Sequence, residues 1–327
     1  MLQNKKAIEM SFTWLFAIIA GIAILSLAIY GATRVINTGT QIVSTESAAK
    51  LTAFLDPAQS GIAYGQVSPP IEFNKEMQIE FSCNLNDNPP FGKQSLIFAE
   101  ESFGKLSEFS VPIDIVNNYV FSEDVLEGKK IYVYSKSFNL PFKVADFIIL
   151  STDQYCFVKA PDGVQDDLQN LKNVNFTEDI DECVDRIPVC FQGIGTGSTS
   201  GCEIIVKDGS GSNLFSVGSV EKKGRSVYYY EGLIYAAIMS SKDNYECNLK
   251  RLMNKFEVVS NLYIDKISIL ERNGCSSRVT SKLNEMIGAA NSFDISIDLK
   301  DRGLIGNSLI VERENSLTMP ACKLYDI

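Results

Sequence analysis

The residues best suited to chemistry in this sequence are its cysteines, because a thiol can form a disulfide, bind a metal or act as a nucleophile. None belongs to a Cys-x-x-Cys pair, the spacing of zinc ribbons and thioredoxin-like sites. The cysteines are even in number and all follow a predicted membrane anchor at residues 12–33, which predicts disulfides in an oxidising compartment. Reduced thiols, some of them buried as small apolar side chains, are the alternative. The eight cysteines are Cys83, Cys156, Cys183, Cys190, Cys202, Cys247, Cys275 and Cys322.

Histidine is absent from the chain. Its absence excludes Ser-His-Asp and Cys-His catalysis and histidine-ligated zinc. Carboxylates are the remaining candidate acids, and Asp294 with Asp298 could cleave a glycosidic bond as an acid and base pair. Their alternation with apolar residues is equally typical of the solvated face of a strand. We therefore assign no catalytic residue, cofactor or metal, and expect a protein that is not an enzyme. A membrane-tethered extracytoplasmic hydrolase using carboxylates is the alternative.

An acidic segment at residues 178–185 surrounds Cys183 and precedes Cys190. Carboxylate oxygens are ligands for calcium, but the spacing and glycine of an EF-hand loop are missing. A solvated acidic loop closed by a Cys183–Cys190 disulfide is the better interpretation, and cation binding stays open. Asn175-Phe176-Thr177 is the one N-x-S/T sequon, so Asn175 is a candidate glycosylation site outside the cell.

The segment from Phe12 to Tyr30 contains no charged residue and no proline. A helix of that length, at about 1.5 Å per residue, just crosses a bilayer core of about 30 Å. We predict a cytoplasmic tail or leader at 1–11 and a transmembrane helix at 12–33. Lysines precede the segment and the cysteines follow it, which favours an inside N-terminus and an extracellular body. The net charge of −10 is spread along the chain, so a nucleic-acid surface is not expected.

The residues from Lys5 to Phe12 resemble the class III leader of archaeal surface proteins with type IV pilin-like N-termini. In that family a short basic leader is removed directly before the hydrophobic segment, which then packs as the core of a filament. The resemblance implies cleavage between Ala7 and Ile8, although the family more often has glycine where Ala7 stands. A plain anchor with an uncut N-terminus is the alternative. Fainter similarity to uncharacterised, membrane-anchored archaeal proteins lies in residues 138–144 and 245–253.

The rest of the chain predicts an α+β fold. Residues 34–56 form an amphipathic helical stalk that ends at Asp56, because the residue before a proline avoids helical angles. The extracytoplasmic body is expected at 57–327, with a possible sub-boundary near 190–200. Alternating or continuous apolar runs predict the following strands: Met77–Cys83, Gln94–Ala99, Lys130–Tyr134, Val144–Leu150, Tyr155–Val158, Glu203–Lys207 and Ser226–Tyr230.

Apolar residues three and four apart predict one long helix over Tyr245–Leu270 and a second over Val279–Ala290. Lys250 and Arg251 lie off the apolar stripe and are expected in solvent. Cys247 and Cys275 would lie at opposite ends of the long helix, about 35 Å apart, and should not pair, because a disulfide requires Cα atoms within about 7 Å.

The chain is expected to end in β-structure. Residues 293–299 alternate strictly between apolar and polar, and Ser308–Glu312 with Leu317–Met319 flank a turn at Glu314-Asn315. Together these features predict a single-pass, non-enzymatic cell-surface protein: a pilin-like filament subunit, or an envelope or adhesion subunit. A membrane-bound receptor or assembly accessory fits the same features. Membrane lipid and self-association through the N-terminal helix are the expected partners.

Overall fold

The computed structural model describes residues 17–31, 51, 67–87, 90–102, 104–116, 118–193, 200–210, 214–275 and 278–325. The chain divides into two compact units, residues 1–50 and 51–327. Residues 17–31 form a helix in the first unit. No helix within the described residues is long and apolar enough to span a membrane. The ends of the expected 12–33 span, and the 34–56 stalk apart from Leu51, lie outside the described residues.

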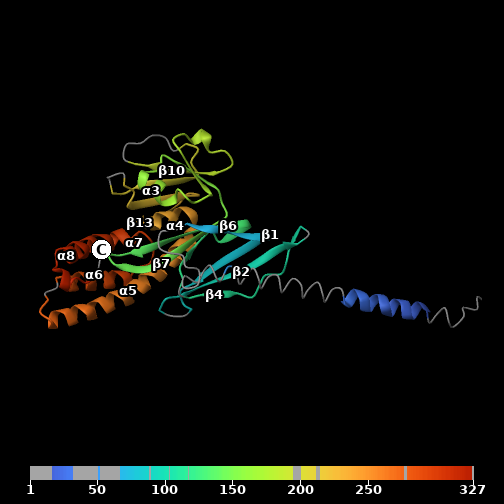
Figure 1. Ribbon diagram of the computed structural model, residues 1–327, viewed down its shortest axis with the longest axis horizontal. Helices are drawn as coiled ribbons and strands as arrows, with labels where there is room; N and C mark the ends of the chain where they lie inside the picture. The colour runs from blue at the N-terminus through green and yellow to red at the C-terminus, as the bar shows by residue number, and fades with distance from the viewer. Residues whose placement is uncertain are drawn as a thin grey trace, which may run out of the picture. The chain divides into compact units, whose positions relative to one another are not determined.

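The second unit opens with a seven-stranded sheet (Figure 1). Its order is β3-β2-β1-β6-β7-β5, and β4 also pairs with β2. All neighbours are antiparallel except β5 and β7, which are parallel. The strands are β1 (Val67–Asn84), β2 (Lys93–Ser102), β3 (Lys105–Leu106), β4 (Ile113–Ile115), β5 (Val120–Phe121), β6 (Val125–Asn139) and β7 (Lys143–Ser151).

A second sheet has six strands in the order β13-β12-β11-β10-β8-β9. Strands β9, β8, β10 and β11 run parallel, and β12 and β13 are antiparallel additions at one edge. Helix α3 (Asp162–Leu168) crosses over between the parallel pair β8 and β9. The strands are β8 (Tyr155–Val158), β9 (Val174–Thr177), β10 (Ile187–Gln192), β11 (Ile204–Asp208), β12 (Val217–Lys222) and β13 (Arg225–Tyr230).

Helices α4 (Leu233–Met239) and α5 (Lys242–Arg272) contact strands of both sheets and join them. Helix α5 is continuous, and its apolar stripe packs on the core, as the sequence predicts. Helix α6 packs on both α5 and α8, and α7 packs on α8. The remaining helical segments are η1 (Ile180–Glu182), α6 (Thr280–Asn291), α7 (Asp298–Asp301), α8 (Leu304–Ser316) and η2 (Pro320–Cys322). The α+β class is therefore confirmed.

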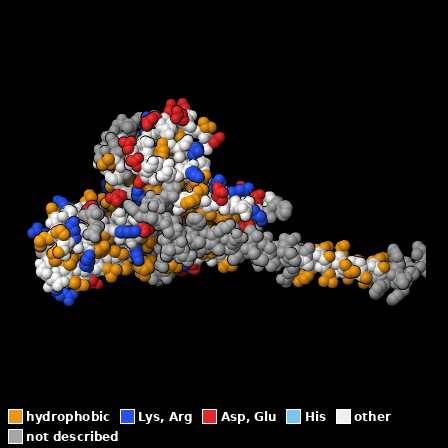
Figure 2. All heavy atoms as spheres, in the orientation of Figure 1, with side chains coloured by type: hydrophobic (Ala, Val, Ile, Leu, Met, Phe, Trp, Pro, Cys, Tyr) orange, Lys and Arg blue, Asp and Glu red, His pale blue; other side chains and the backbone are white. Residues whose placement is uncertain are grey.

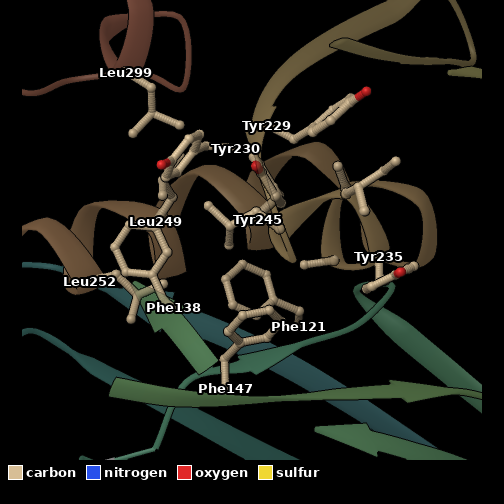
Figure 3. Packing of buried hydrophobic residues seen from close by; sticks show 14 of the residues in the cluster. Phe121, Phe138, Phe147, Tyr229, Tyr230, Tyr235, Tyr245, Leu249, Leu252 and Leu299 are labelled. Carbon is tan, nitrogen blue, oxygen red and sulfur yellow. The ribbon is translucent and has the colours of Figure 1, made fainter. Parts of the chain in front are cut away.

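The buried apolar core extends over both sheets, and one part of it lies where the first sheet meets these helices (Figure 3). Phe121 of β5 packs edge-on against Phe147 of β7 with ring centroids 5.3 Å apart. Tyr245 of α5 lies 5.7 Å from Phe121, and its hydroxyl donates to the Tyr228 carbonyl of β13 at 2.8 Å. Tyr245 thus links the first sheet to the second through one fully buried side chain.

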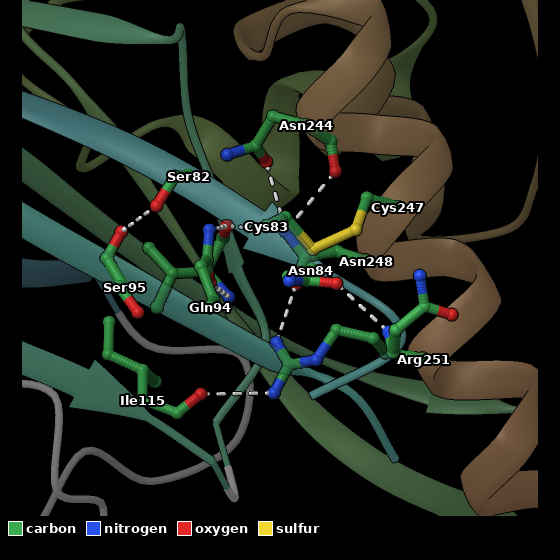
Figure 4. Close-up of a disulfide and its surroundings, with 12 residues drawn as sticks. Ser82, Cys83, Asn84, Gln94, Ser95, Ile115, Asn244, Cys247, Asn248 and Arg251 are labelled. Atoms are coloured by element: carbon green, nitrogen blue, oxygen red, sulfur yellow. Dashed lines mark hydrogen bonds between the residues drawn. A yellow bond between two sulfur atoms is a disulfide. The ribbon is translucent and has the colours of Figure 1, made fainter. Parts of the chain in front are cut away.

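All eight cysteines are paired, which confirms the predicted disulfides. Cys247 and Cys275 belong to different bonds, as the helix length requires. The predicted Cys183–Cys190 bridge is wrong, because Cys183 is bonded to Cys156 of β8 and Cys190 is bonded to Cys202 in the segment before β11. The Cα atoms are 5.6–6.3 Å apart in the pairs Cys83–Cys247 (Figure 4), Cys156–Cys183, Cys190–Cys202 and Cys275–Cys322.

The predicted strand over residues 293–299 is wrong. Ile295 is 48% exposed, whereas Ser296 is buried, so burial does not follow the apolar alternation. The Ser296 amide and hydroxyl donate to the Glu246 carboxylate of α5 at 2.6 and 2.7 Å, and the Ser296 hydroxyl accepts from the Tyr228 amide at 2.8 Å. These polar contacts hold the segment as a loop that leads into α7.

The predicted C-terminal hairpin is also wrong, because residues 304–316 form α8. The buried face of α8 consists of Leu304, Ser308, Val311 and Asn315, spaced four, three and four residues apart. Because two of these four residues are polar, the hydrophobicity pattern does not show the helical spacing of the buried face. Asn315 donates to the Tyr325 carbonyl at 2.9 Å and accepts from the Leu324 amide at 2.7 Å, which fixes the C-terminal segment.

Candidate functional site

The proposed leader cleavage positions, Ala7 and Ile8, lie outside the described residues. Asn175 is exposed on β9, which is an edge strand of the second sheet. The Thr177 hydroxyl of the same sequon contacts the Glu182 carboxylate and accepts from the Asp179 amide at 3.1 Å. The asparagine amide is thus accessible from solvent, whereas the threonine takes part in a local turn.

The acidic segment 178–185 forms an exposed turn around η1, and acidic side chains gather on this part of the surface (Figure 2). Asp179 caps η1 by accepting from the Asp181 amide at 3.1 Å. Cys183 fastens the turn to β8 through Cys156. Within the described residues, no group of three or more acidic or cysteine side chains is placed to hold a metal ion.

The carboxylates of Asp294 and Asp298 do not share one face of a strand, because Asp298 begins α7. Asp298 accepts from the Asp294 and Ile295 amides at 2.7 and 3.3 Å and pairs with Arg302 at 3.0 Å. Partial burial alone would raise the pKa of Asp298. The hydrogen bonds from the two amides and the charge of Arg302 outweigh burial, and the net effect is a lowered pKa. Asp298 therefore orients the loop before α7 by accepting from two of its amides.

A cavity of about 320 Å³ lies between the β12–β13 hairpin and the start of α5. We call it the basic cavity, because four cations face it and only two carboxylates do. Its walls also include small and apolar side chains from β12, β13 and α4. The residues lining the basic cavity are Glu123, Asp124, Val220, Lys222, Lys223, Arg225, Val227, Ala237, Ser240, Ser241 and Lys242.

The floor of the basic cavity is internally paired. The Lys222 ammonium contacts the Glu123 carboxylate and donates to the carbonyls of Ile238 and Ser240 at 3.2 and 3.4 Å. The Ser241 hydroxyl donates to Asp124 at 2.5 Å. Both carboxylates of the cavity therefore already have partners within the protein.

The rim of the basic cavity carries Lys223, Arg225 and Lys242, all exposed. Among the described residues, no ion pair joins any of the three to a carboxylate. Lys223 and Gly224 form the two-residue turn between β12 and β13, with φ of 51° and 71°. Both φ values are positive, as in the type I′ turns that suit the twist of a hairpin.

A second cavity, of about 670 Å³, lies beside α3 and α4 and is mostly apolar; we call it the apolar cavity. Asp167 faces it and is held by Lys136 at 2.6 Å and by the Tyr235 hydroxyl at 2.5 Å. Three of its lining residues have left-handed backbones: Lys159, Phe215 and Glu231, with φ of 56°, 52° and 47°. Because the Asp167 carboxylate is already held by these two partners, it is not available as a free catalytic acid or base.

The sequence does not single out either cavity. Part of the basic cavity is visible as Lys222-Lys223-Gly224-Arg225, a two-residue turn flanked by cations. The fourth cation of the cavity, Lys242, is distant in sequence. The comparisons with known proteins add no relative: no protein-family model, no curated protein and no solved structure matches the chain.

Proposed function

We propose that the chain is a membrane-anchored, non-enzymatic cell-surface protein whose disulfide-bonded body faces an oxidising exterior. The observation that carries the proposal is the pairing of every cysteine in the sequence. Disulfides persist outside the reducing cytosol, and four of them in one body are typical of secreted or surface-exposed domains.

The N-terminal helix supports the anchor. Large apolar side chains on residues 17–31 are 41–71% exposed, and they cover the drawn helix (Figure 2). In water such a surface would cost free energy, which contact with lipid or with other apolar helices removes. The sequence extends this apolar run to Phe12, and we propose that the extended segment crosses the bilayer. Copies of the helix packing together would give a pilin-like filament.

Two measurements on the native protein test the proposal. Alkylation without reductant, followed by peptide mapping, should label none of the eight cysteines and should recover the four observed pairs. Labelling of all eight thiols would overturn the extracellular placement. Intact mass should then separate the two forms of the proposal. A chain beginning at Ile8 supports the pilin-like form, and a chain retaining residues 1–7 leaves a plain anchor.

A further inference from the structure

We propose that the basic cavity binds a phosphoryl group, carried by free phosphate, by a phosphorylated small molecule or by a lipid headgroup. The lining contains four cations and two carboxylates, which leaves an excess of two positive charges. That excess matches a phosphoryl dianion and contrasts with the net charge of −10 of the whole chain. Valine and alanine side chains in the wall offer contact to an attached carbon skeleton.

The cations on the rim are the ones available to a ligand. Lys222 is committed to Glu123 on the floor, and Asp124 accepts the Ser241 hydroxyl. Lys223, Arg225 and Lys242 come from two elements and line the same cavity. Arginine can hold two oxygens of one phosphoryl group with its planar fork, and lysines add point charges around it.

The start of α5 adds to the positive potential of the cavity. Ser241 caps this 31-residue helix by accepting from the Asn244 amide at 3.1 Å. Among the described residues, the amides of Lys242 and Asp243 have no such acceptor. The first turn of a long helix carries partial positive charge, which favours an anion at that end. The helix thus reinforces a site that the three rim cations already define.

The backbone at Lys223 allows the binding role of this side chain to be separated from its effect on stability. Asparagine and glycine are the residues that adopt a left-handed conformation most readily, whereas a lysine there is strained. Substituting asparagine should therefore relax the turn and remove a ligand contact at the same time. This opposite effect on stability and binding is not expected of a purely structural lysine.

The test is calorimetric titration of the full chain in dodecyl maltoside, a detergent without phosphate. The probes are inorganic phosphate, glycerol 3-phosphate and dihexanoylphosphatidic acid, and the tightest binder identifies the source of the phosphoryl group. We expect saturable binding of at least one probe at one per chain. The K223N/R225Q double variant should bind at least tenfold more weakly, because each lost contact is a charge-assisted hydrogen bond.

Lys159→Asn is the matched control. Lys159 also has a left-handed backbone, with φ of 56°, but it lines the apolar cavity. K159N and K223N should each unfold at a higher temperature than wild type, and only K223N should weaken binding. Absence of binding by all three probes would overturn the proposal, as would equal binding by wild type and the K223N/R225Q variant.

Discussion

Arg251 is the residue whose environment departs furthest from its sequence prediction. The sequence predicts that Arg251 lies in solvent, yet its side chain is fully buried. Its guanidinium donates to the carbonyls of Phe91, Asn118, Ile115 and Val116 and to the Asn248 side chain (Figure 4 shows part of this network). It also lies 5.0 Å from the centre of the Tyr119 ring. Arg251 therefore fastens α5 to the loop before β2, to the end of β4 and to the loop after β4.

Replacing Arg251 by methionine should destabilise the body by about 3–5 kcal/mol, because several buried carbonyls would lose their donor. Lysine should recover only part of this loss, since an ammonium cannot reach all of the acceptors. Urea unfolding of the two variants measures the difference. Arg272→Met on the exposed end of the same helix is the control and should change little. Equal stabilities for R251M and R272M would contradict the proposed role of Arg251 in fastening α5 to these loops.

Glu246 makes the stability of the body depend on pH. Burial raises the pKa of Glu246 above its ordinary value of 4.5, although hydrogen bonds from Ser296 act in the opposite direction. The folded state therefore holds this proton more tightly than the unfolded chain. Its contribution to stability is complete below the unfolded pKa and is lost as the pH rises through the folded pKa.

Replacement of Glu246 by glutamine should remove this pH-dependent contribution to stability, because glutamine does not ionise. Relative to wild type, E246Q should therefore retain more of its melting temperature as the pH rises from about 4 to about 7. Glu271→Gln, on an exposed part of α5, should leave the wild-type pH profile unchanged. A wild-type profile in E246Q would show that burial of Glu246 has no energetic consequence.

The elements most visible in the sequence are those with a continuous apolar stripe or run. Helix α5 carries such a stripe beside its buried polar residues, strand β8 is apolar throughout, and both lie where the sequence predicts them. Helix α8 and the loop at Ser296 are held by buried polar groups, which a hydrophobicity pattern counts as exposed. For the same reason the hydrophobicity pattern predicts an exposed Arg251, whereas its side chain is buried. The sequence shows the cationic turn of the basic cavity but not the cavity itself, because the cavity depends on a tertiary contact between a hairpin and the start of α5.

Individual disulfides differ in what they constrain. Cys83–Cys247 joins β1 to α5 across 164 residues, whereas Cys190–Cys202 closes a segment of 12 residues between β10 and β11. In the chain-entropy model, the long closure stabilises by about 5 kcal/mol and the short one by about 3 kcal/mol. The C83A/C247A variant should therefore lose more stability than C190A/C202A in denaturant unfolding. The reverse order would mean that local packing, rather than loop closure, sets the contribution of each bond.

At the scale of the whole molecule, the proposal depends on the apolar N-terminal helix. Ile22 and Leu25 are 62% and 65% exposed on residues 17–31 and lie three residues apart on one face. A lysine near the centre of a membrane helix costs about 2.5–3.5 kcal/mol, so two of them should exceed what a short apolar segment gains. The double variant I22K/L25K should therefore move from the membrane fraction to the soluble fraction.

The body of that variant should keep its fold, because residues 51–327 form a compact unit with all four disulfides. Leu262→Lys is the control: Leu262 is 63% exposed on α5, so its lysine adds charge to the body and leaves the anchor intact. L262K should sediment with membranes after carbonate extraction, as wild type should. If I22K/L25K also stays with the membranes, the N-terminal helix is not the anchor. If wild type is soluble, the helix must instead pack against an apolar partner.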